Sequence, residues 1–181
     1  MCAKSDEQLA LLAAGGDRAA FGTLVSRWES RLYRFVLVRL GSDHDSAEVV
    51  QETMLRAWRA MPRFKPSAKF STWLFSIAHR ETVNVVRRRQ RDQKDARREA
   101  PANETEERET GGLLAEVWRI ARETLDDSVF EVVWLRYAED MEPKQIARVT
   151  GKTAVGVRVA LHRARQRLAD AIGEQESLEA E

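Results

Sequence analysis

This sequence of 181 residues has a single cysteine, Cys2, and only three scattered histidines, His44, His79 and His162. One thiol cannot form an internal disulfide bond or supply a zinc site built from several thiolates. Isolated histidines are more often surface or core residues than metal ligands. We therefore expect no bound metal.

The chain also lacks a long apolar run and the motifs of common enzymes. It has no stretch of about 18 uncharged apolar residues, which argues against a membrane-spanning helix. Asp6 and Glu7 stand where the apolar part of a signal peptide would begin, so we expect a cytoplasmic protein. It has neither a phosphate-binding glycine loop nor a nucleophile with a base and an orienting group. We therefore expect a protein that is not an enzyme and needs no cofactor.

Glycine and proline are scarce, with nine and four residues. Apolar residues recur at steps of three and four, which predicts an all-α fold. This periodicity disappears in the middle of the chain, where acidic residues accumulate. We predict two small helical domains at 1–92 and 113–173, a flexible acidic linker at 93–112 and an acidic tail at 174–181 that is irregular.

Within the first domain, Ser5 with Gln8 is placed to cap one helix and Asp17 to cap a second, which Gly41 ends. We expect Phe21 and Val25 on the buried stripe of the second helix and Trp73 in the core.

Positive charge is concentrated in two blocks. Residues 53–98 hold thirteen lysines and arginines against three acidic residues, and residues 144–167 hold seven against none. The formal net charge of +1 for the whole chain conceals both blocks. Basic patches of this size are typical of proteins that bind a polyanion, most often a nucleic acid.

The second block has the spacing of a helix-turn-helix. Pro143 is placed to open a short helix, Gly151 to form the turn, and Thr153 to cap a longer helix. On the longer helix, Arg158 and His162 share a face away from the apolar positions, as residues that enter a major groove do. The alternative is a three-helix bundle with a solvated basic face.

The first block begins within a helix expected at about 45–61, which has Ala47, Val50 and Met54 on its inner face. Its outer stripe mixes polar and apolar residues, which suits docking on a protein partner but also plain solvation. A loop at 62–70 then alternates cations with aromatic residues, and Ser71 is a suitable N-cap for the next helix. Aromatic residues that stack on bases, beside cations that follow the backbone, are typical of single-strand binding.

Six short segments carry a resemblance to a known family. They are Asp17–Phe21, Val49–Trp58, Phe70–Leu74, Val133–Tyr137, Gln145–Ala147 and Leu161–Arg165. An arginine cluster, Arg87–Arg89, lies between the third and fourth segments. In this order the segments and the cluster resemble bacterial sigma factors of the extracytoplasmic-function (ECF) class in the sigma-70 family. The resemblance implies a transcription initiation factor that directs core RNA polymerase to promoters, recognises −35 and −10 elements and stabilises the melted −10 strand.

The resemblance assigns a role to each domain. The first would bind polymerase and the −10 element, and the second would read the −35 element. The polymerase contact would be formed by Asp45, Glu48, Gln51, Glu52, Leu55, Arg56 and Trp58. The −10 surface would be formed by Arg63, Phe64, Lys65, Lys69, Phe70, Ser71, Arg80, Asn84, Arg87 and Arg88. The −35 surface would be formed by Lys152, Thr153, Arg158, His162, Arg163 and Arg165.

Two features leave questions open. Phe64 and Phe70 have equal claims as core residues, because aromatic residues beside a helix start usually pack inward. Val159 and Ala160 stand where the family usually has a serine and an arginine, so one DNA contact is missing and the −35 preference is open. The resemblance also implies an anti-sigma factor as a partner, often membrane-anchored, with this chain monomeric or in a heterodimer and not itself inserted in the membrane.

The main alternative is a repressor or activator that never joins polymerase, because many regulators share the helix-turn-helix. Such a regulator needs a dimerisation or ligand module, whereas the first domain has a second basic surface with aromatic residues. An RNA-binding adaptor would instead need a single-strand platform without a helix-turn-helix.

Overall fold

The computed structural model describes residues 4–67, 69–95 and 113–179, and the chain divides into two compact units, Met1–Thr105 and Glu106–Glu181. Within the described residues both units are built from helices without strands, which confirms the all-α prediction. None of the described helices is long and apolar enough to cross a membrane.

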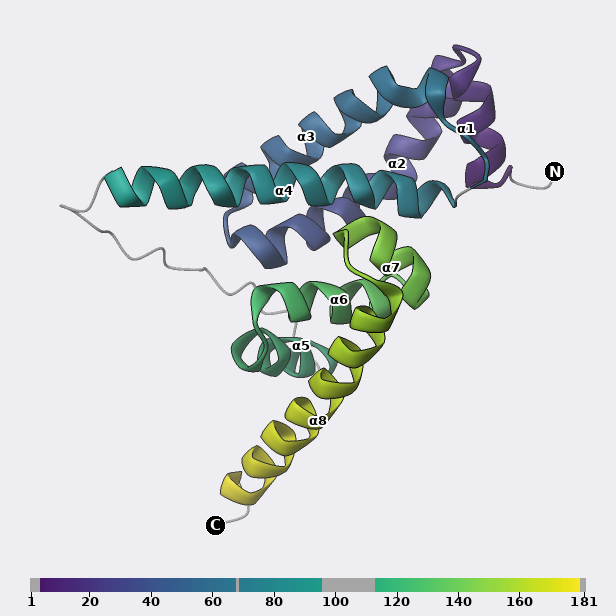
Figure 1. Ribbon diagram of the computed structural model, residues 1–181. Helices are drawn as coiled ribbons and strands as arrows, with labels where there is room; N and C mark the ends of the chain where they lie inside the picture. The colour runs from purple at the N-terminus through teal and green to yellow at the C-terminus, as the bar shows by residue number, and fades with distance from the viewer. Residues whose placement is uncertain (1–3, 68, 96–112, 180–181) are drawn as a thin grey trace. The chain divides into compact units, whose positions relative to one another are not determined.

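The first unit is a helical bundle around one long central helix (Figure 1). Its elements are α1 (Asp6–Ala14), α2 (Arg18–Leu40), α3 (Asp43–Ala60), the 3-10 helix η1 (Met61–Arg63) and α4 (Phe70–Asp95). α2 packs against α1, α3 and α4. Phe35 of α2 and Phe75 of α4 meet in the core edge to face, with ring centroids 5.1 Å apart.

Local sequence signals set several helix ends in this unit. Ser5 and Gln8 form a capping box at the start of α1. The Asp17 carboxylate accepts hydrogen bonds from two amides in the first turn of α2, and Gly41 ends that helix with a φ of 62°. These predicted caps are confirmed.

The start of α4 differs from the prediction. The helix begins at Phe70, so Ser71 lies in its first turn and is not its N-cap. The Phe70 amide instead donates a hydrogen bond to Oε1 of Glu7 in α1, at 3.2 Å. This carboxylate accepts from a backbone amide that has no partner within the helix. Its negative charge also interacts favourably with the positive end of the helix dipole. α1 therefore helps to fix where α4 begins.

The inner face of α3 also differs from the prediction. Val50 is buried, but Ala47 is exposed and Met54 is half-buried. Val49 and Thr53 are buried in their place. α3 contacts both α2 and α4, so its buried stripe faces the space between two helices rather than a single neighbour.

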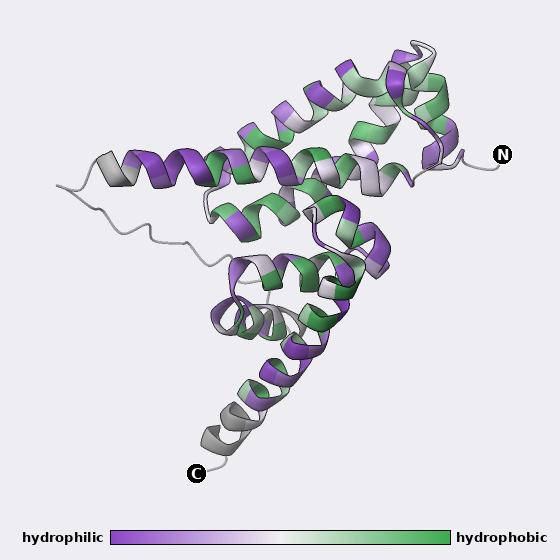
Figure 2. Cartoon of the chain, viewed as in Figure 1, coloured by the Kyte–Doolittle hydropathy of each residue, from purple (hydrophilic) through white to green (hydrophobic). Residues whose placement is uncertain are grey.

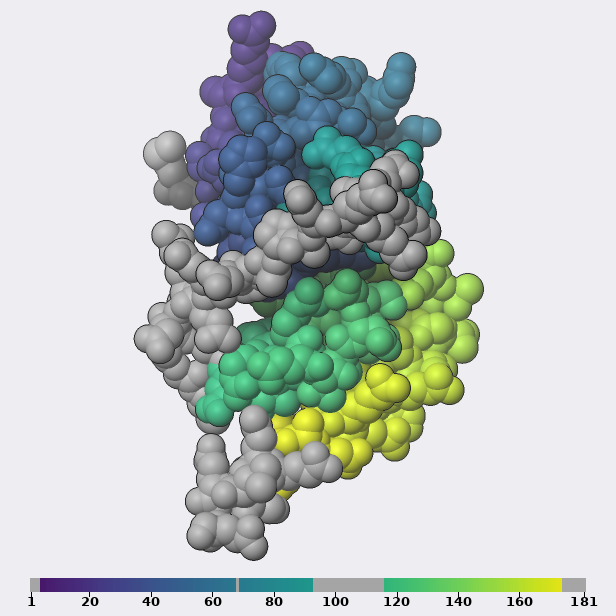
Figure 3. Space-filling model, turned by 90° about the vertical axis from the view of Figure 1, so that its left-hand side faces the viewer, coloured from purple at the N-terminus to yellow at the C-terminus, as the bar shows by residue number. Residues whose placement is uncertain are grey.

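The second unit surrounds one helix with three others. It contains α5 (Leu113–Thr124), α6 (Asp127–Tyr137), α7 (Pro143–Thr150) and α8 (Ala154–Glu179), and α8 contacts each of the others. In the space-filling view the green surfaces of α5 and α6 lie against the yellow α8 (Figure 3). The rings of Trp118 and Trp134, 4.7 Å apart, join α5 to α6.

The helix-turn-helix formed by α7 and α8 follows the predicted local signals. Pro143 opens α7, and Gly151 takes a φ of 72° in the turn. Thr153 caps α8, because its Oγ1 accepts a hydrogen bond from the Gly156 amide at 3.0 Å. Val157 is fully buried beneath the start of α8.

Two helices run further than the sequence indicated. α4 continues to Asp95, inside the segment expected to be a linker, and the rest of that segment, 96–112, lies outside the described residues. α8 continues to Glu179, although the tail was expected to be irregular. Residues 174–179 contain glutamate, glutamine and leucine and no proline or glycine, a composition that favours helix.

Candidate functional site

α3 presents its polymerase-contact candidates on an exposed side. The Ser42 hydroxyl accepts a hydrogen bond from the Asp45 amide at 3.3 Å, which caps the helix and fixes where the stripe begins. Glu48, Gln51 and Leu55 follow at steps of three and four, and all are exposed. Leu55 is 44% exposed, so the stripe offers an apolar side chain among polar ones.

Arg56, at the end of this stripe, is tied to two carboxylates. Its Nε donates to Oε1 of Glu52 at 2.6 Å, and its Nη1 lies 2.7 Å from Oε1 of Glu81 on α4. The hydrogen bond to Glu52, with the negative charge of Glu81, raises the pKa of the guanidinium. Glu81 is only 7% exposed, so Arg56 compensates a buried charge as well as lining the surface.

Asp45, at the other end of the stripe, is bound within the unit. Its carboxylate accepts a hydrogen bond from Nη2 of Arg89 on α4, and Nη1 of Arg89 donates to the Leu40 carbonyl at 2.8 Å. The Arg89 hydrogen bond holds the pKa of Asp45 below its ordinary value. One arginine thus joins the end of α2 and the start of α3 to α4, and Asp45 has less of its carboxylate available for a partner.

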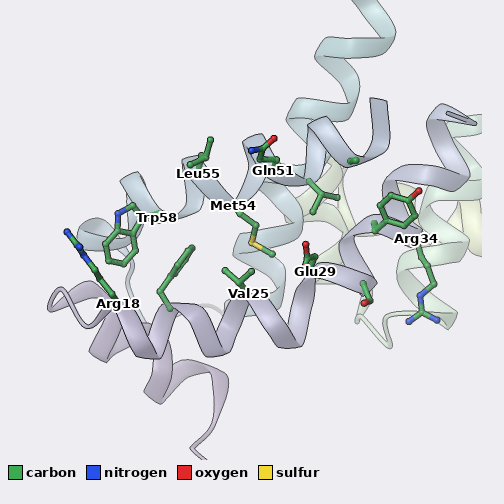
Figure 4. A pocket seen from close by; sticks show the side chains of 13 residues that line it. Arg18, Val25, Glu29, Arg34, Gln51, Met54, Leu55 and Trp58 are labelled. Atoms are coloured by element: carbon green, nitrogen blue, oxygen red, sulfur yellow. The ribbon is translucent and has the colours of Figure 1, made fainter. Parts of the chain in front are cut away.

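A groove of about 1250 Å³ runs between α2 and α3 beside this stripe. Figure 4 shows Met54 pointing from α3 toward Val25 of α2, with Gln51 and Leu55 at the rim. Trp58 packs against Phe21 at the end of the groove, with the rings tilted by 52° and their centroids 5.0 Å apart. Trp58 was predicted as part of this surface, whereas the wall from α2 was not.

The missed wall combines apolar residues with charged ones at the rim. Its members on α2 are Arg18, Phe21, Val25, Glu29, Ser30, Tyr33 and Arg34. The signal was present in the sequence, because Phe21 and Val25 were assigned to the core of α2 although both are only half-buried. An apolar floor with a charged rim is the form of groove that receives an amphipathic helix.

The cationic face of α4 carries most of the −10 candidates. Arg80, Asn84 and Arg87 are exposed at steps of four and three, and Arg88 is exposed beside them. Arg91, which the sequence analysis left out, continues this face one turn further and is exposed. Figure 2 shows hydrophilic colouring over most of the C-terminal half of α4. Arg63, Lys65 and Lys69 add exposed cations before the helix.

Two aromatic candidates for base stacking lie in the core instead. Phe70 is 1% exposed and Phe64 is 7% exposed, and their ring centroids are 5.9 Å apart. Trp73 packs against both rings but stays half-buried, as does Ser71. The burial of Phe64 and Phe70 does not fit stacking on unpaired bases. Trp73, which was assigned to the core, is the more accessible ring.

All of the −35 candidates in the second unit are exposed. They are Lys152, Thr153, Arg158, His162, Arg163 and Arg165. Thr153 caps α8, and the others are exposed on the turn or on the helix beside and opposite the buried Val157 and Leu161. This arrangement suits entry of α8 into a major groove.

One group on α3 brings three metal-ligand types together. Among the described residues, His44, Asp45 and Glu48 have ligand atoms within 4.8 Å of one another. Asp45 is already bound by Arg89, and the other two side chains are exposed. The group therefore lacks the set of free ligands that a structural metal site needs.

Known proteins match both units. A family profile described as "Sigma-70 region 2" matches residues 24–92, and one described as "Sigma-70, region 4" matches residues 123–168. The chain is 28% identical over 181 aligned residues to the ECF RNA polymerase sigma-E factor of Haemophilus influenzae, covering 93% of this chain and 95% of that one. It is 32% identical over 77 residues to the ECF RNA polymerase sigma factor SigW of Bacillus subtilis, over 42% of this chain and 41% of that one.

A solved structure has a similar fold. CnrH, in complex with the cytosolic domain of CnrY, matches with a TM-score of 0.69 and 27% identity, covering 94% of this chain and 99% of that one. With the two profiles, these similarities define a two-domain bacterial sigma factor. The chain belongs to the ECF class of the sigma-70 family and is a transcription initiation factor that directs RNA polymerase to promoters.

Proposed function

We propose that three surfaces of this sigma factor divide the work of initiation. The exposed stripe of α3, with the groove beside it, binds core RNA polymerase. The cationic face of α4, with the lysines and arginine of the preceding loop, holds the melted −10 strand. α8 enters the major groove of the −35 element. The single observation that supports this division best is the exposed polar and cationic face of α8 opposite its buried anchors.

Electrostatics supports a −10 role for α4. Arg80, Arg87, Arg88 and Arg91 lie along one side of a long helix, where they can follow the phosphates of one strand. Because Phe64 and Phe70 are buried, base stacking falls to Trp73, the half-buried ring at the start of the helix. Neutralising several phosphates makes binding fall steeply with salt concentration.

We also propose that an anti-sigma factor binds this chain. CnrH, which it resembles, was solved with the cytosolic domain of CnrY. The groove between α2 and α3 and the stripe of α3 form one continuous surface, since Gln51 and Leu55 belong to both. An inhibitor seated there would compete directly with polymerase. A sigma factor acts by binding alone, so we expect no catalysis by this chain and a cytoplasmic site of action.

Co-purification with core RNA polymerase, followed by run-off transcription from a promoter library, tests the polymerase surface. We expect stoichiometric binding and transcription that depends on the added protein. Changing Gln51→Ala and Leu55→Ala together should weaken polymerase binding without loss of helicity. Leu11→Ala is the matched control, because Leu11 is similarly exposed but lies on α1.

An unchanged polymerase affinity of the double variant would show that the α3 stripe is merely solvated. Failure of the wild-type chain to bind core polymerase, with duplex DNA still bound tightly, would favour the alternative of a helix-turn-helix regulator that acts without polymerase.

A further inference from the structure

The face of α8 that points away from its core carries two exposed valines. Val155, Arg158, Val159 and His162 occur at steps of three, one and three, so they share one side of the helix. Val155 is 60% exposed and Val159 is 44% exposed. The core side of the helix is filled by Val157, which is fully buried.

These valines lie outside the apolar core of the second unit. Val157, Leu161 and Ala164 already supply the contacts of α8 with its neighbours. A β-branched residue lowers helix propensity slightly, and an exposed one gains no compensating burial. A partner surface with apolar groups would bury this exposed pair and remove it from water, which favours binding.

The surroundings of the pair indicate duplex DNA. Arg158 and His162 lie on the same face, and no described residue forms an ion pair or hydrogen bond with either. Gly156 places no side chain beside Val155, so the first turn of the helix can approach closely. In the major groove, the apolar group on a base edge is the C5-methyl of thymine.

We propose that Val155 and Val159 are specificity-determining residues that read thymine methyl groups in the −35 element. This inference rests on the proposed role of α8 in duplex recognition. Four residues of helix span about 6 Å, and base pairs are stacked about 3.4 Å apart, so the two valines reach base pairs about two steps apart. The −35 element is therefore expected to have A·T pairs at two nearby positions, beside a G·C pair read by Arg158.

The test uses the full-length chain with core RNA polymerase. Selection from a promoter library by run-off transcription first gives the −35 element. Each conserved thymine in it is then replaced by deoxyuridine, which removes one methyl group and keeps the base pair. A buried methyl group corresponds to roughly a fourfold change in affinity. We expect a loss of that size at one or two positions.

Variants connect the loss to the valines. The Val155→Ala and Val159→Ala variants should each lose sensitivity to deoxyuridine at the base pair that the replaced valine contacts. Because alanine favours the helix, neither substitution should disrupt α8. Val117→Ala is the matched control, since Val117 is also exposed but lies on α5. This control should keep the full sensitivity of the wild type.

The outcomes separate this inference from the proposed function. If base-pair changes in the −35 element do not alter binding at all, α8 does not read that element and both fail. If such changes matter but deoxyuridine has no effect, or the valine variants stay as sensitive as the wild type, the inference alone is overturned. A selected element without conserved A·T pairs also overturns it, and the valines would then face a protein partner.

Discussion

The two cationic helices, α4 and α8, use their arginines in different ways. Arg89 of α4 is bound to Asp45, and Glu81 of α4 in turn binds Arg56 of α3. On α8, Arg158 forms no ion pair with any residue that the structure describes. The acids differ in burial: Glu81 is buried and Asp45 is half-buried in the first unit, whereas Asp126, which lies 3.8 Å from Arg167 of α8, is exposed. A charge count therefore overstates the DNA surface of the first unit more than that of the second, where Arg167 alone among the described arginines of α8 forms an ion pair.

The largest effect is expected where an arginine has only a binding role. Arg158→Ala should weaken binding to the −35 element by about 2 kcal/mol, because a base contact by arginine is lost. Its free energy of unfolding in urea should stay within about 0.5 kcal/mol of the wild type. Affinity is measured on the selected promoter, with Arg167→Ala as a control on another side of α8. A clear loss of stability in Arg158→Ala would break the contrast between the helices.

Arg56→Ala should show the opposite pattern. It leaves the buried Glu81 carboxylate without its ion-pair partner, which should lower the free energy of unfolding by about 1.5 kcal/mol. Urea denaturation followed by circular dichroism measures this loss. Replacing Glu81 as well, in Arg56→Leu with Glu81→Leu, should recover part of it, since no buried charge remains. If the double variant is no more stable than Arg56→Ala, burial of Glu81 is not the cause.

Neighbouring arginines on α4 should separate structure from binding. Arg89→Ala removes the hydrogen bonds to Asp45 and the Leu40 carbonyl, and should cost about 1 kcal/mol of stability. Arg88→Ala, one residue earlier and exposed, should leave stability unchanged but reduce binding to a single-stranded −10 oligonucleotide and its dependence on salt. Equal stability of the two variants would count against a structural role for Arg89.

The smallest effect concerns pH. Arg89 lowers the pKa of Asp45 from its ordinary value of 3.8, so the folded state favours the carboxylate. The stability from this pair is fully present above pH 3.8 and is lost as the pH falls through the lower folded pKa. Urea unfolding of the wild type and Asp45→Asn from neutral pH downward measures it. The advantage of the wild type should shrink in acid, and a constant difference would contradict the assignment.

The features that the sequence predicted correctly depend on neighbours along the chain. Ser5, Asp17 and Thr153 cap helices whose first amides lie two or three residues away, and Gly151 forms the turn it was assigned. Steps of three and four residues likewise separated Val157 from Arg158 on α8. Such patterns are complete within a few residues.

The features that it missed depend on contacts between distant residues. Glu7 caps α4 from 63 residues away, and Arg89 reaches Asp45 across 44 residues. Phe64 and Phe70 suited either a stacking surface or a core, and only the packing of Trp28 against Phe70 decides for the core. The wall that α2 contributes to the groove was not predicted, because buried and half-buried apolar residues recur along α2 at the same spacing and the sequence alone does not distinguish them.

Trp58, which packs against Phe21 in the groove, gives this protein a natural optical probe. An indole that is half-buried in an open groove is partly hydrated, and its emission lies at longer wavelength than that of a dry indole. A segment that fills the groove would remove this water and shift the emission to the blue. Trp28, which is buried in the core, would emit unchanged. The chain has five tryptophans, so the probe requires a variant in which the other four are replaced by phenylalanine. In that variant the emission of Trp58 would report when a segment without tryptophan fills the groove.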